Sequence, residues 1–227
     1  MPEAKLDLNR EHFRAIIYYN FQRQLSFSDD PRVGAPKTAV IQENVDAQKA
    51  ARVNWCQKTL DLFNFGNSKD VYSIVSGDES WIYCYEPENK RQRWSRHFCQ
   101  KRYTTICLPK VITELRKINP ERSIILHQDN ASSHTAQKTS HYLTEENVEL
   151  LDHPPYSPDL SSNDFFTFPK IKNRLRGQRF QSPEEAVDAF KDTVLDLPAN
   201  DWNECFENWF ERMQMCINLR GEYFKKQ

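Results

Sequence analysis

The chain alternates short continuous apolar runs with longer stretches in which apolar residues recur at helical spacing. The run 123–128, SIILHQ, passes into a polar cluster, which is typical of a buried strand. The run 71–85 has the same character, and 148–151 indicates a short third strand. Helices are predicted over 7–25, 40–63, 103–119, 135–146, 183–195 and 202–219. Strands that alternate with helices predict an α/β fold.

Three of the predicted helices have apolar faces that would build a core. The helix over 40–63 has an apolar face made of Ala47, Ala50, Ala51 and Trp55. The face of the helix over 103–119, which would cover the sheet, consists of Ile106, Leu108, Val111, Ile112, Leu115 and Ile118. The face of the last helix consists of Trp202, Cys205, Phe206, Trp209, Phe210 and Met213. An aromatic stripe at this spacing predicts core and not a ligand-binding site.

Turn-forming residues divide these elements from one another. Residues 26–38, SFSDDPRVGAPKT, have the composition of a linker. Residues 153–160 contain three prolines, which remove backbone donors and fix φ, so this segment is predicted to be irregular. Ser182 followed by Pro183 predicts a helix start, with serine as the N-cap and proline at the first helical position.

Three aspartates stand where predicted strands end or a helix begins. Asp78 lies inside the first predicted strand, Asp129 follows the second, and Asp164 comes after the proline-rich segment. Carboxylate oxygens suit Mg2+ or Mn2+, and two such ions about 4 Å apart can hold the attacking and leaving oxygens of a phosphoryl displacement. The alternative for any one of these aspartates is a helix cap or a solvated charge.

The sequence motifs around these aspartates resemble a known family. SGDESWIY around Asp78, HQDNASSHT around Asp129 and HPPYSPDLSSNDFF around Asp164 are similar to the three catalytic-aspartate motifs of mariner transposases. Thirty-four residues separate Asp129 from Asp164, which is the diagnostic interval of that catalytic domain, and the resemblance continues through 103–227. It implies a ribonuclease-H-like mixed sheet with flanking helices, a triad of aspartates that holds two divalent metals, and the cutting and joining of DNA.

The chain departs from the family pattern at two places. After a first helix that resembles the start of the family's helix-turn-helix region, it passes directly into the linker, so the recognition helices are missing. The interval from Asp78 to Asp129 is also short, which predicts a sheet that lacks two strands through a deletion near 89–102 and leaves the Asp78 strand as an exposed edge. We therefore predict three regions: 1–38 as a remnant DNA-binding region and linker, 39–70 as a helical lead-in, and 71–227 as the catalytic domain.

Composition excludes some classes of protein, and the distribution of basic residues indicates DNA as a partner. The 227 residues suffice for one or two domains, and 38% hydrophobic with 12% aromatic residues excludes a disordered composition. The formal net charge is -1, but basic residues gather in two patches. The candidate DNA-binding residues are Lys90, Arg91, Arg93, Lys170, Lys172, Arg174, Arg176 and Arg179. Phosphate contacts by such patches are independent of sequence and sensitive to salt; the alternative is a solvated surface.

The histidines and cysteines do not predict a second catalytic or metal-binding site. His127 and His134 flank Asp129, but two-metal chemistry requires no general base, which favours structural or substrate-positioning roles for both. The six cysteines form no C-x-x-C pair, so they are interpreted as reduced thiols and not as zinc ligands. No signal peptide and no apolar run of about 18 residues is present, which predicts an intracellular chain without a membrane span.

These patterns lead to one main hypothesis and two alternatives. The main hypothesis is a mariner-like transposase derivative that cleaves and transfers DNA strands in a metal-dependent reaction, with sequence specificity lost, a homodimer as a candidate assembly, and the nucleus as its location. The first alternative is a non-catalytic nucleic-acid-binding remnant of a transposase. The second is a decayed gene product without a selected function.

Overall fold

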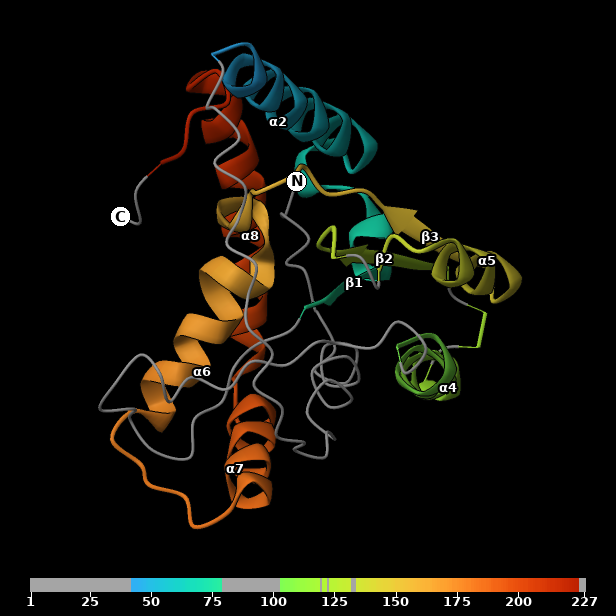
Figure 1. Ribbon diagram of the computed structural model, residues 1–227, viewed down its shortest axis with the longest axis vertical. Helices are drawn as coiled ribbons and strands as arrows, with labels where there is room; N and C mark the ends of the chain where they lie inside the picture. Colours follow the sequence, from blue (N-terminus) through green and yellow to red (C-terminus); the bar gives the residue numbers. More distant parts are fainter. Residues whose placement is uncertain (1–41, 79–102, 119, 122, 132–133, 225–227) are drawn as a thin grey trace, which may run out of the picture.

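The computed structural model describes residues 42–78, 103–118, 120–121, 123–131 and 134–224, with helices on both sides of a small sheet (Figure 1). Its strands are β1 Ile74–Gly77, β2 Ile124–Gln128 and β3 Val148–Leu151, in the order β1-β2-β3. Both pairings are parallel, and the register places Gly77 opposite Gln128. All five residues of β2 are buried because this strand lies at the centre. The predicted α/β fold with neighbouring Asp78 and Asp129 strands is confirmed.

One face of the sheet is covered by the helix that precedes β2. A π-helical turn, Tyr103–Cys107, leads into α4 Leu108–Ile118. The predicted apolar face is buried at Leu108, Val111, Ile112 and Leu115, and it packs with β-strand residues in one cluster. The prediction is wrong for Ile106, which is 45% exposed because it lies in the π-helical turn before α4 begins. The connection from β2 to β3 contains α5 Gln137–Glu145, which confirms the predicted helix there.

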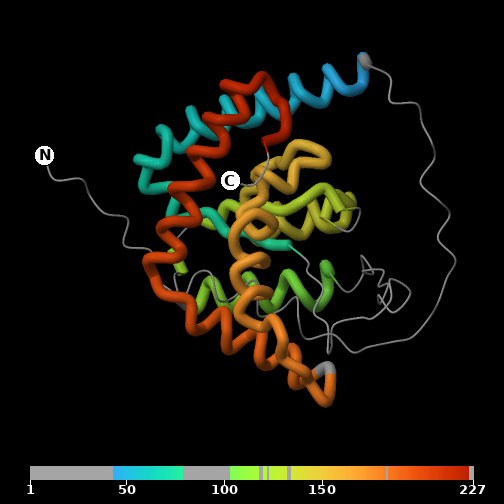
Figure 2. The backbone as a smooth tube through the Cα atoms, turned by 90° about the vertical axis from the view of Figure 1, so that its left-hand side faces the viewer, coloured from blue at the N-terminus to red at the C-terminus, as the bar shows by residue number. Residues whose placement is uncertain are grey.

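The other face packs against two long helices, α2 Gln42–Leu62 and α8 Ala199–Asn218, which lie side by side in both views (Figures 1 and 2). The stripe of α8 is buried as predicted, except that Phe210 is only partly buried. The apolar face predicted for α2 is wrong at its three alanines, which are exposed. The buried face of α2 consists of Arg52, Trp55, Cys56, Thr59 and Leu60.

A third helical layer follows the proline-rich segment. A short 3-10 turn, Pro158–Leu160, and a π-helical turn, Asn163–Thr167, lead into α6 Phe168–Leu175. The next helix, α7 Pro183–Leu195, begins as predicted, because the Ser182 side chain accepts a hydrogen bond from the backbone N–H of Glu185. A separate small core joins α6, α7 and the start of α8.

Within the range of the predicted lead-in, 39–70, the structure describes α2 and the 3-10 turn Asn64–Gly66, and a second 3-10 turn, Lys69–Ser73, crosses its end. The remnant DNA-binding region at 1–38 and the deletion near 89–102 lie outside the described residues, so both stay predictions. The three described strands are all parallel, and the antiparallel pairing that a mixed sheet requires is not seen among the described residues.

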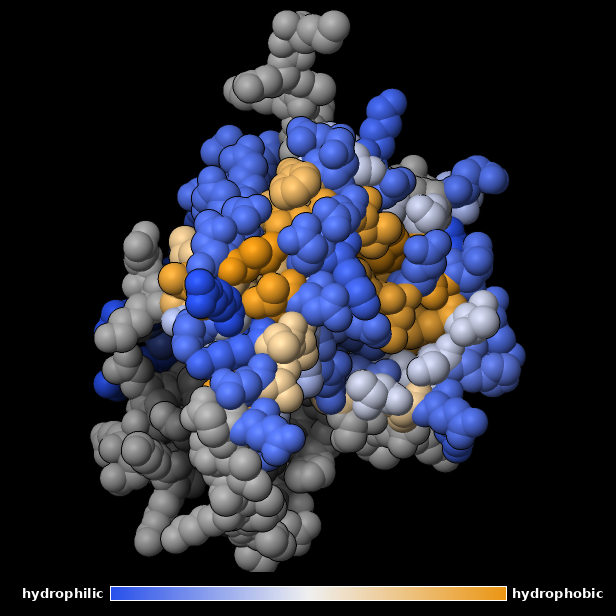
Figure 3. Space-filling view, turned by 90° about the horizontal axis from the view of Figure 1, so that it is seen from above, coloured by the Kyte–Doolittle hydropathy of each residue, from blue (hydrophilic) through white to orange (hydrophobic). Residues whose placement is uncertain are grey.

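On the face seen from above, hydrophobic areas alternate with hydrophilic side chains (Figure 3). Among the described helices, none has the length and apolar content needed to cross a membrane.

Candidate active site

The fold brings the first two predicted aspartates to one edge of the sheet. Asp78 follows the last residue of β1, and Asp129 follows the last residue of β2. Since the paired strands end in register at Gly77 and Gln128, the two backbones emerge roughly 5 Å apart, the usual spacing of neighbouring strands. Burial of hydrophobic strand residues below this edge therefore delivers two carboxylates to its surface.

The third aspartate reaches the same edge through the chain segment that precedes it. Ser162 Oγ lies 2.9 Å from Ser76 Oγ of β1, and Asn163 Nδ2 donates to the same oxygen at 3.2 Å. Ser161 Oγ donates to Asp78 Oδ2 at 3.4 Å. Asp164, in the first turn of the π-helical segment, is thus anchored beside the end of β1.

Asp129 is held by two hydrogen bonds to a single oxygen. His134 Nδ1 lies 2.6 Å from Asp129 Oδ1, and the backbone N–H of Ala131 donates to the same oxygen at 3.1 Å. Burial alone would raise the pKa of the Asp129 carboxyl, but the bond from His134, together with that from Ala131, holds the pKa below its ordinary value. Within the described part of the chain, Oδ2 of Asp129 accepts no hydrogen bond, and the side chain is 45% exposed.

His134 is fixed in place by its own surroundings. Only 3% of its side chain is exposed, and the centre of its ring lies 4.6 Å from that of Tyr103. The Tyr103 hydroxyl in turn donates to Oε1 of Gln128, the residue before Asp129. These contacts support a structural role for His134, which is one of the two roles that the sequence favours.

His127 belongs to a buried hydrogen-bonded chain on β2. Because the carbonyl of Ser157 can only accept, His153 donates to it from Nε2 at 3.1 Å. Nδ1 of His153 then accepts from Nε2 of His127 at 3.0 Å. Burial lowers the pKa of His153 to about 4 and that of His127 well below its ordinary value, so both rings are neutral at pH 7. His127 packs against Trp55 and Trp209, which supports a structural role.

The basic patch of α6 divides into residues that face acids and residues that face solvent. Lys170 Nζ lies 2.9 Å from Oδ1 of Asp201 on α8, and a guanidinium nitrogen of Arg174 lies 3.8 Å from the other carboxylate oxygen. Arg176 and Arg179 are exposed. Lys90, Arg91 and Arg93 lie outside the described residues.

Lys172 of α6 lies within electrostatic reach of two candidate metal ligands. Partial burial lowers the pKa of its ammonium group, and the carboxylates of Asp164 and Asp78 oppose that effect. Sequence reasoning assigned Lys172 to DNA phosphates and missed this position. The spacing of the two residues in the sequence was the available signal. Lys172 lies two successive four-residue steps after Asp164 along a continuous helical segment, and side chains four residues apart lie on the same helix face.

The donor chemistry of the three aspartates fits a divalent metal, because hard carboxylate oxygens are the ligands that Mg2+ and Mn2+ prefer. Across residues 42–78, 103–118, 120–121, 123–131 and 134–224, however, no group of three or more His, Cys, Asp or Glu side chains converges closely enough to hold an ion. The structure thus brings the three chain segments to one edge without forming a closed ligand cluster.

Fold and site together define a class of nuclease. Residues 63–186 match the family described as "DDE superfamily endonuclease", and the chain belongs to that family. Within it, the chain is a mariner-family sequence with a ribonuclease-H-like fold. It is 26% identical over 223 residues to the mariner Mos1 transposase of Drosophila mauritiana, covering 79% of this chain and 64% of that protein. It is 37% identical over 115 residues to the human histone-lysine N-methyltransferase SETMAR, covering 49% of this chain and 16% of that protein.

Solved structures agree with this assignment. The crystal structure of the Mos1 catalytic domain superposes with a TM-score of 0.69 at 25% identity, over 79% of this chain and 96% of that one. The same domain solved with raltegravir and Mn gives a TM-score of 0.68 at 25% identity, over 79% and 97%. The chain spans less than two thirds of the length of the two curated relatives named above.

Proposed function

We propose that this protein is a mariner-type transposase derivative that cleaves DNA phosphodiesters in a metal-dependent reaction. The observation that carries the proposal is the delivery of Asp78, Asp129 and Asp164 to one edge of the sheet by β1, β2 and the segment bonded to Ser76. Family membership supports the same reaction class. Mos1 has been solved with Mn and with Mg, which supports Mg2+ or Mn2+ as the cofactor here.

In this proposal the three aspartates hold two divalent ions, which when bound activate the attacking oxygen and stabilise the leaving one. The chain's own residues prepare the ligands. His134 and Ala131 occupy Oδ1 of Asp129, so that Oδ2 is the oxygen presented for coordination. Ser161 donates to Asp78, and Ser162 and Asn163 contact Ser76, so the residues directly before Asp164 are bonded to β1 and to the first aspartate.

The proposed partner is DNA, contacted through phosphates by the exposed basic residues of the α6 region. Mos1 has been solved as a pre-cleavage transpososome and as a paired-end complex, which supports DNA as the substrate and a homodimer as a candidate assembly. Because DNA is the substrate, we place the protein in the nucleus. The predicted absence of recognition helices concerns residues outside the described ranges; on that prediction we expect DNA binding without sequence preference.

The test is calorimetric titration of the full chain with Mn2+ and Mg2+, followed by a plasmid-nicking assay. Asp129→Asn is expected to abolish both metal binding and nicking, because it removes one ligand charge while keeping side-chain volume. Asp192→Asn is the matched control, since this acid lies exposed on α7 and its carboxylate makes no hydrogen bond or ion pair among the described residues. Equal metal binding by wild type and Asp129→Asn would refute the proposal. A folded wild type that binds DNA but no metal would instead favour the non-catalytic alternative.

A further inference from the structure

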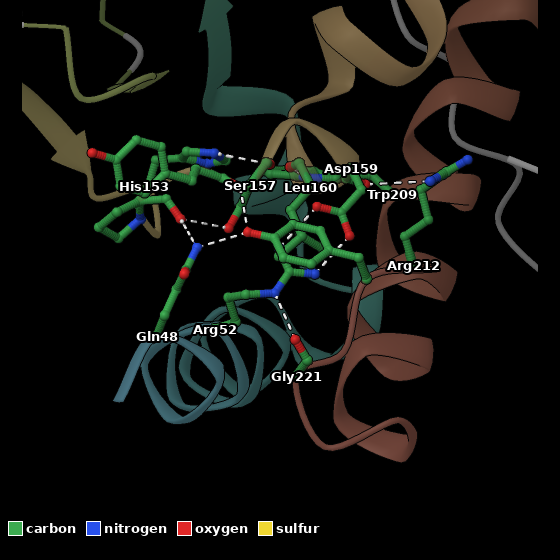
Figure 4. Close-up of polar contacts among 12 residues, drawn as sticks. Gln48, Arg52, His153, Ser157, Asp159, Leu160, Trp209, Arg212 and Gly221 are labelled. Atoms are coloured by element: carbon green, nitrogen blue, oxygen red, sulfur yellow. Dashed lines mark hydrogen bonds and ion pairs between the residues drawn. The ribbon is translucent and has the colours of Figure 1, made fainter. Parts of the chain in front are cut away.

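Arg52 is a fully buried charge in the middle of α2. Its side chain has 0% exposure, and it forms two parallel hydrogen bonds to Asp159, at 2.8 and 2.6 Å (Figure 4). Asp159 lies in the Pro158–Leu160 turn, 107 residues further along the chain. Two-pronged contacts of this kind fix distance and direction together, which a hydrophobic contact does not.

The segment after Asp159 continues directly into the candidate active site. Arg212 donates to the Asp159 carbonyl at 3.3 Å, and Trp209 Nε1 donates to the Leu160 carbonyl at 2.7 Å (Figure 4). The Leu160 side chain is fully buried. The next three residues, 161–163, are those that contact β1 and Asp78. A fixed Asp159 therefore sets where the chain enters the turn that carries Asp164.

The same arginine also holds the end of the described chain. Its Nε donates to the carbonyl of Gly221 at 3.0 Å, and its guanidinium carbon lies 4.2 Å from the centre of the Tyr223 ring. The Tyr223 hydroxyl donates to the carbonyl of Tyr156 at 2.6 Å, and Gln48 of α2 donates to that hydroxyl at 2.7 Å. Arg52 thus joins α2, the proline-rich segment and the chain after α8.

A buried ion pair is poor evidence for stability alone, because desolvation of the two charges offsets most of their attraction. Apolar side chains of similar volume would fill the same space between α2 and the turn. What only the ion pair supplies is a fixed relative position of the two segments. The Arg52–Asp159 pair therefore contributes more to the geometry of these segments than to the stability of the fold.

We propose that Arg52 is a positioning residue that, through Asp159 and residues 160–163, fixes Asp164 against Asp78. This inference rests on the proposed function in one respect, namely that these two aspartates share metal ions. The positioning itself is a property of the metal-free chain and is measurable without catalysis.

The experiment compares backbone amide exchange in the metal-free full chain for residues 161–167 with exchange in α4. The main variant is the double substitution Arg52→Met with Asp159→Leu, which removes both charges and so leaves no unpaired buried ion. A second variant, Arg52→Lys, keeps the charge but loses the two-pronged geometry. Lys49→Met is the matched control, because Lys49 lies on the same helix and pairs with Glu222 at 2.5 Å near the surface.

The double variant is expected to speed exchange at 161–167 by about tenfold or more while α4 stays unchanged, since a lost charged hydrogen bond loosens its own segment first. Arg52→Lys is expected to fall between the double variant and wild type, and Lys49→Met to match wild type. Unchanged exchange at 161–167, or equal acceleration there and in α4, would overturn the proposal. Mn2+ titration of the same proteins separates the two hypotheses, because a wild type that binds no Mn2+ contradicts the proposed function while the exchange result still decides the positioning role.

Discussion

Acid is expected to destabilise this protein through the buried histidine chain. His153 is 8% exposed, and its pKa falls from 6.5 to about 4 in the folded protein. The unfolded chain therefore binds a proton more readily, so the contribution to stability is present above pH 6.5 and is lost as pH falls toward 4. His127, whose pKa is also lowered by burial, adds to the loss in the same direction.

The size of the effect follows from the pKa difference of His153. A difference of about 2.5 pH units corresponds to about 3 kcal/mol, of which about 2 kcal/mol is already lost at pH 5. This is a large fraction of the roughly 5–15 kcal/mol that stabilises a typical domain. Protonation would also break the chain, because a protonated His153 cannot accept the bond from His127.

Urea unfolding followed by circular dichroism at several pH values between about 7.5 and 5 measures this loss. His153→Gln is expected to be less stable at the upper end of this range and to show a weaker pH dependence, because only the part contributed by His127 remains. His141→Gln is the matched control, because the His141 side chain is 74% exposed and its removal leaves the buried chain intact. A wild-type stability that stays flat across the range would refute the reasoning, as would a loss of pH dependence in His141→Gln.

Two further predictions use pairs of residues that differ in one respect. Gly221 and Gly177 both have a φ near +80°, but a Cβ at Gly221 would overlap the backbone of α2, while one at Gly177 meets nothing within 4 Å. Gly177→Ala is expected to lower the free energy of unfolding by about 1–2 kcal/mol, because alanine is strained in the left-handed conformation. Gly221→Ala is expected to lower it by about 1–3 kcal/mol more, because its Cβ also overlaps the backbone of α2. Equal losses in thermal unfolding of the two variants would contradict this. In DNA binding, Arg176→Gln is expected to reduce the slope of log affinity against log salt by about 0.9. Lys170→Gln is expected to change it less, because Lys170 already pairs with a carboxylate of α8; an equal change in both variants would show that the ion pair opens on DNA.

Most elements were predictable because their signals are local. The continuous apolar run before Asp129 becomes the central strand β2, and the Ser182 start of α7 depends on neighbouring residues alone. The apolar face predicted for α2 is wrong because local hydrophobicity does not reveal which charge has a buried partner. The three alanines are exposed, while Arg52, which pairs with Asp159, is fully buried.

In the candidate site, too, local motifs predicted some features and only the structure revealed others. The sequence motifs placed Asp129 at a strand end and Asp164 at a helix start, and the structure has both there. Asp78, predicted inside the first strand, directly follows β1. The motifs carried no information on the partner of Asp159. The structure pairs this carboxylate with Arg52 through both of its oxygens, which gives it a role in the fold.

The sequence by itself therefore determined the order of the helices and strands, the family, and the three aspartates that candidate chemistry requires. Only the tertiary structure decided which charges are paired, that Lys172 lies near two of those aspartates, and that the described carboxylates form no closed ligand cluster. The physical reason is the range of the interactions. Helix caps and apolar periodicity act within a few residues, whereas these contacts join segments far apart in the chain and depend on how whole elements pack.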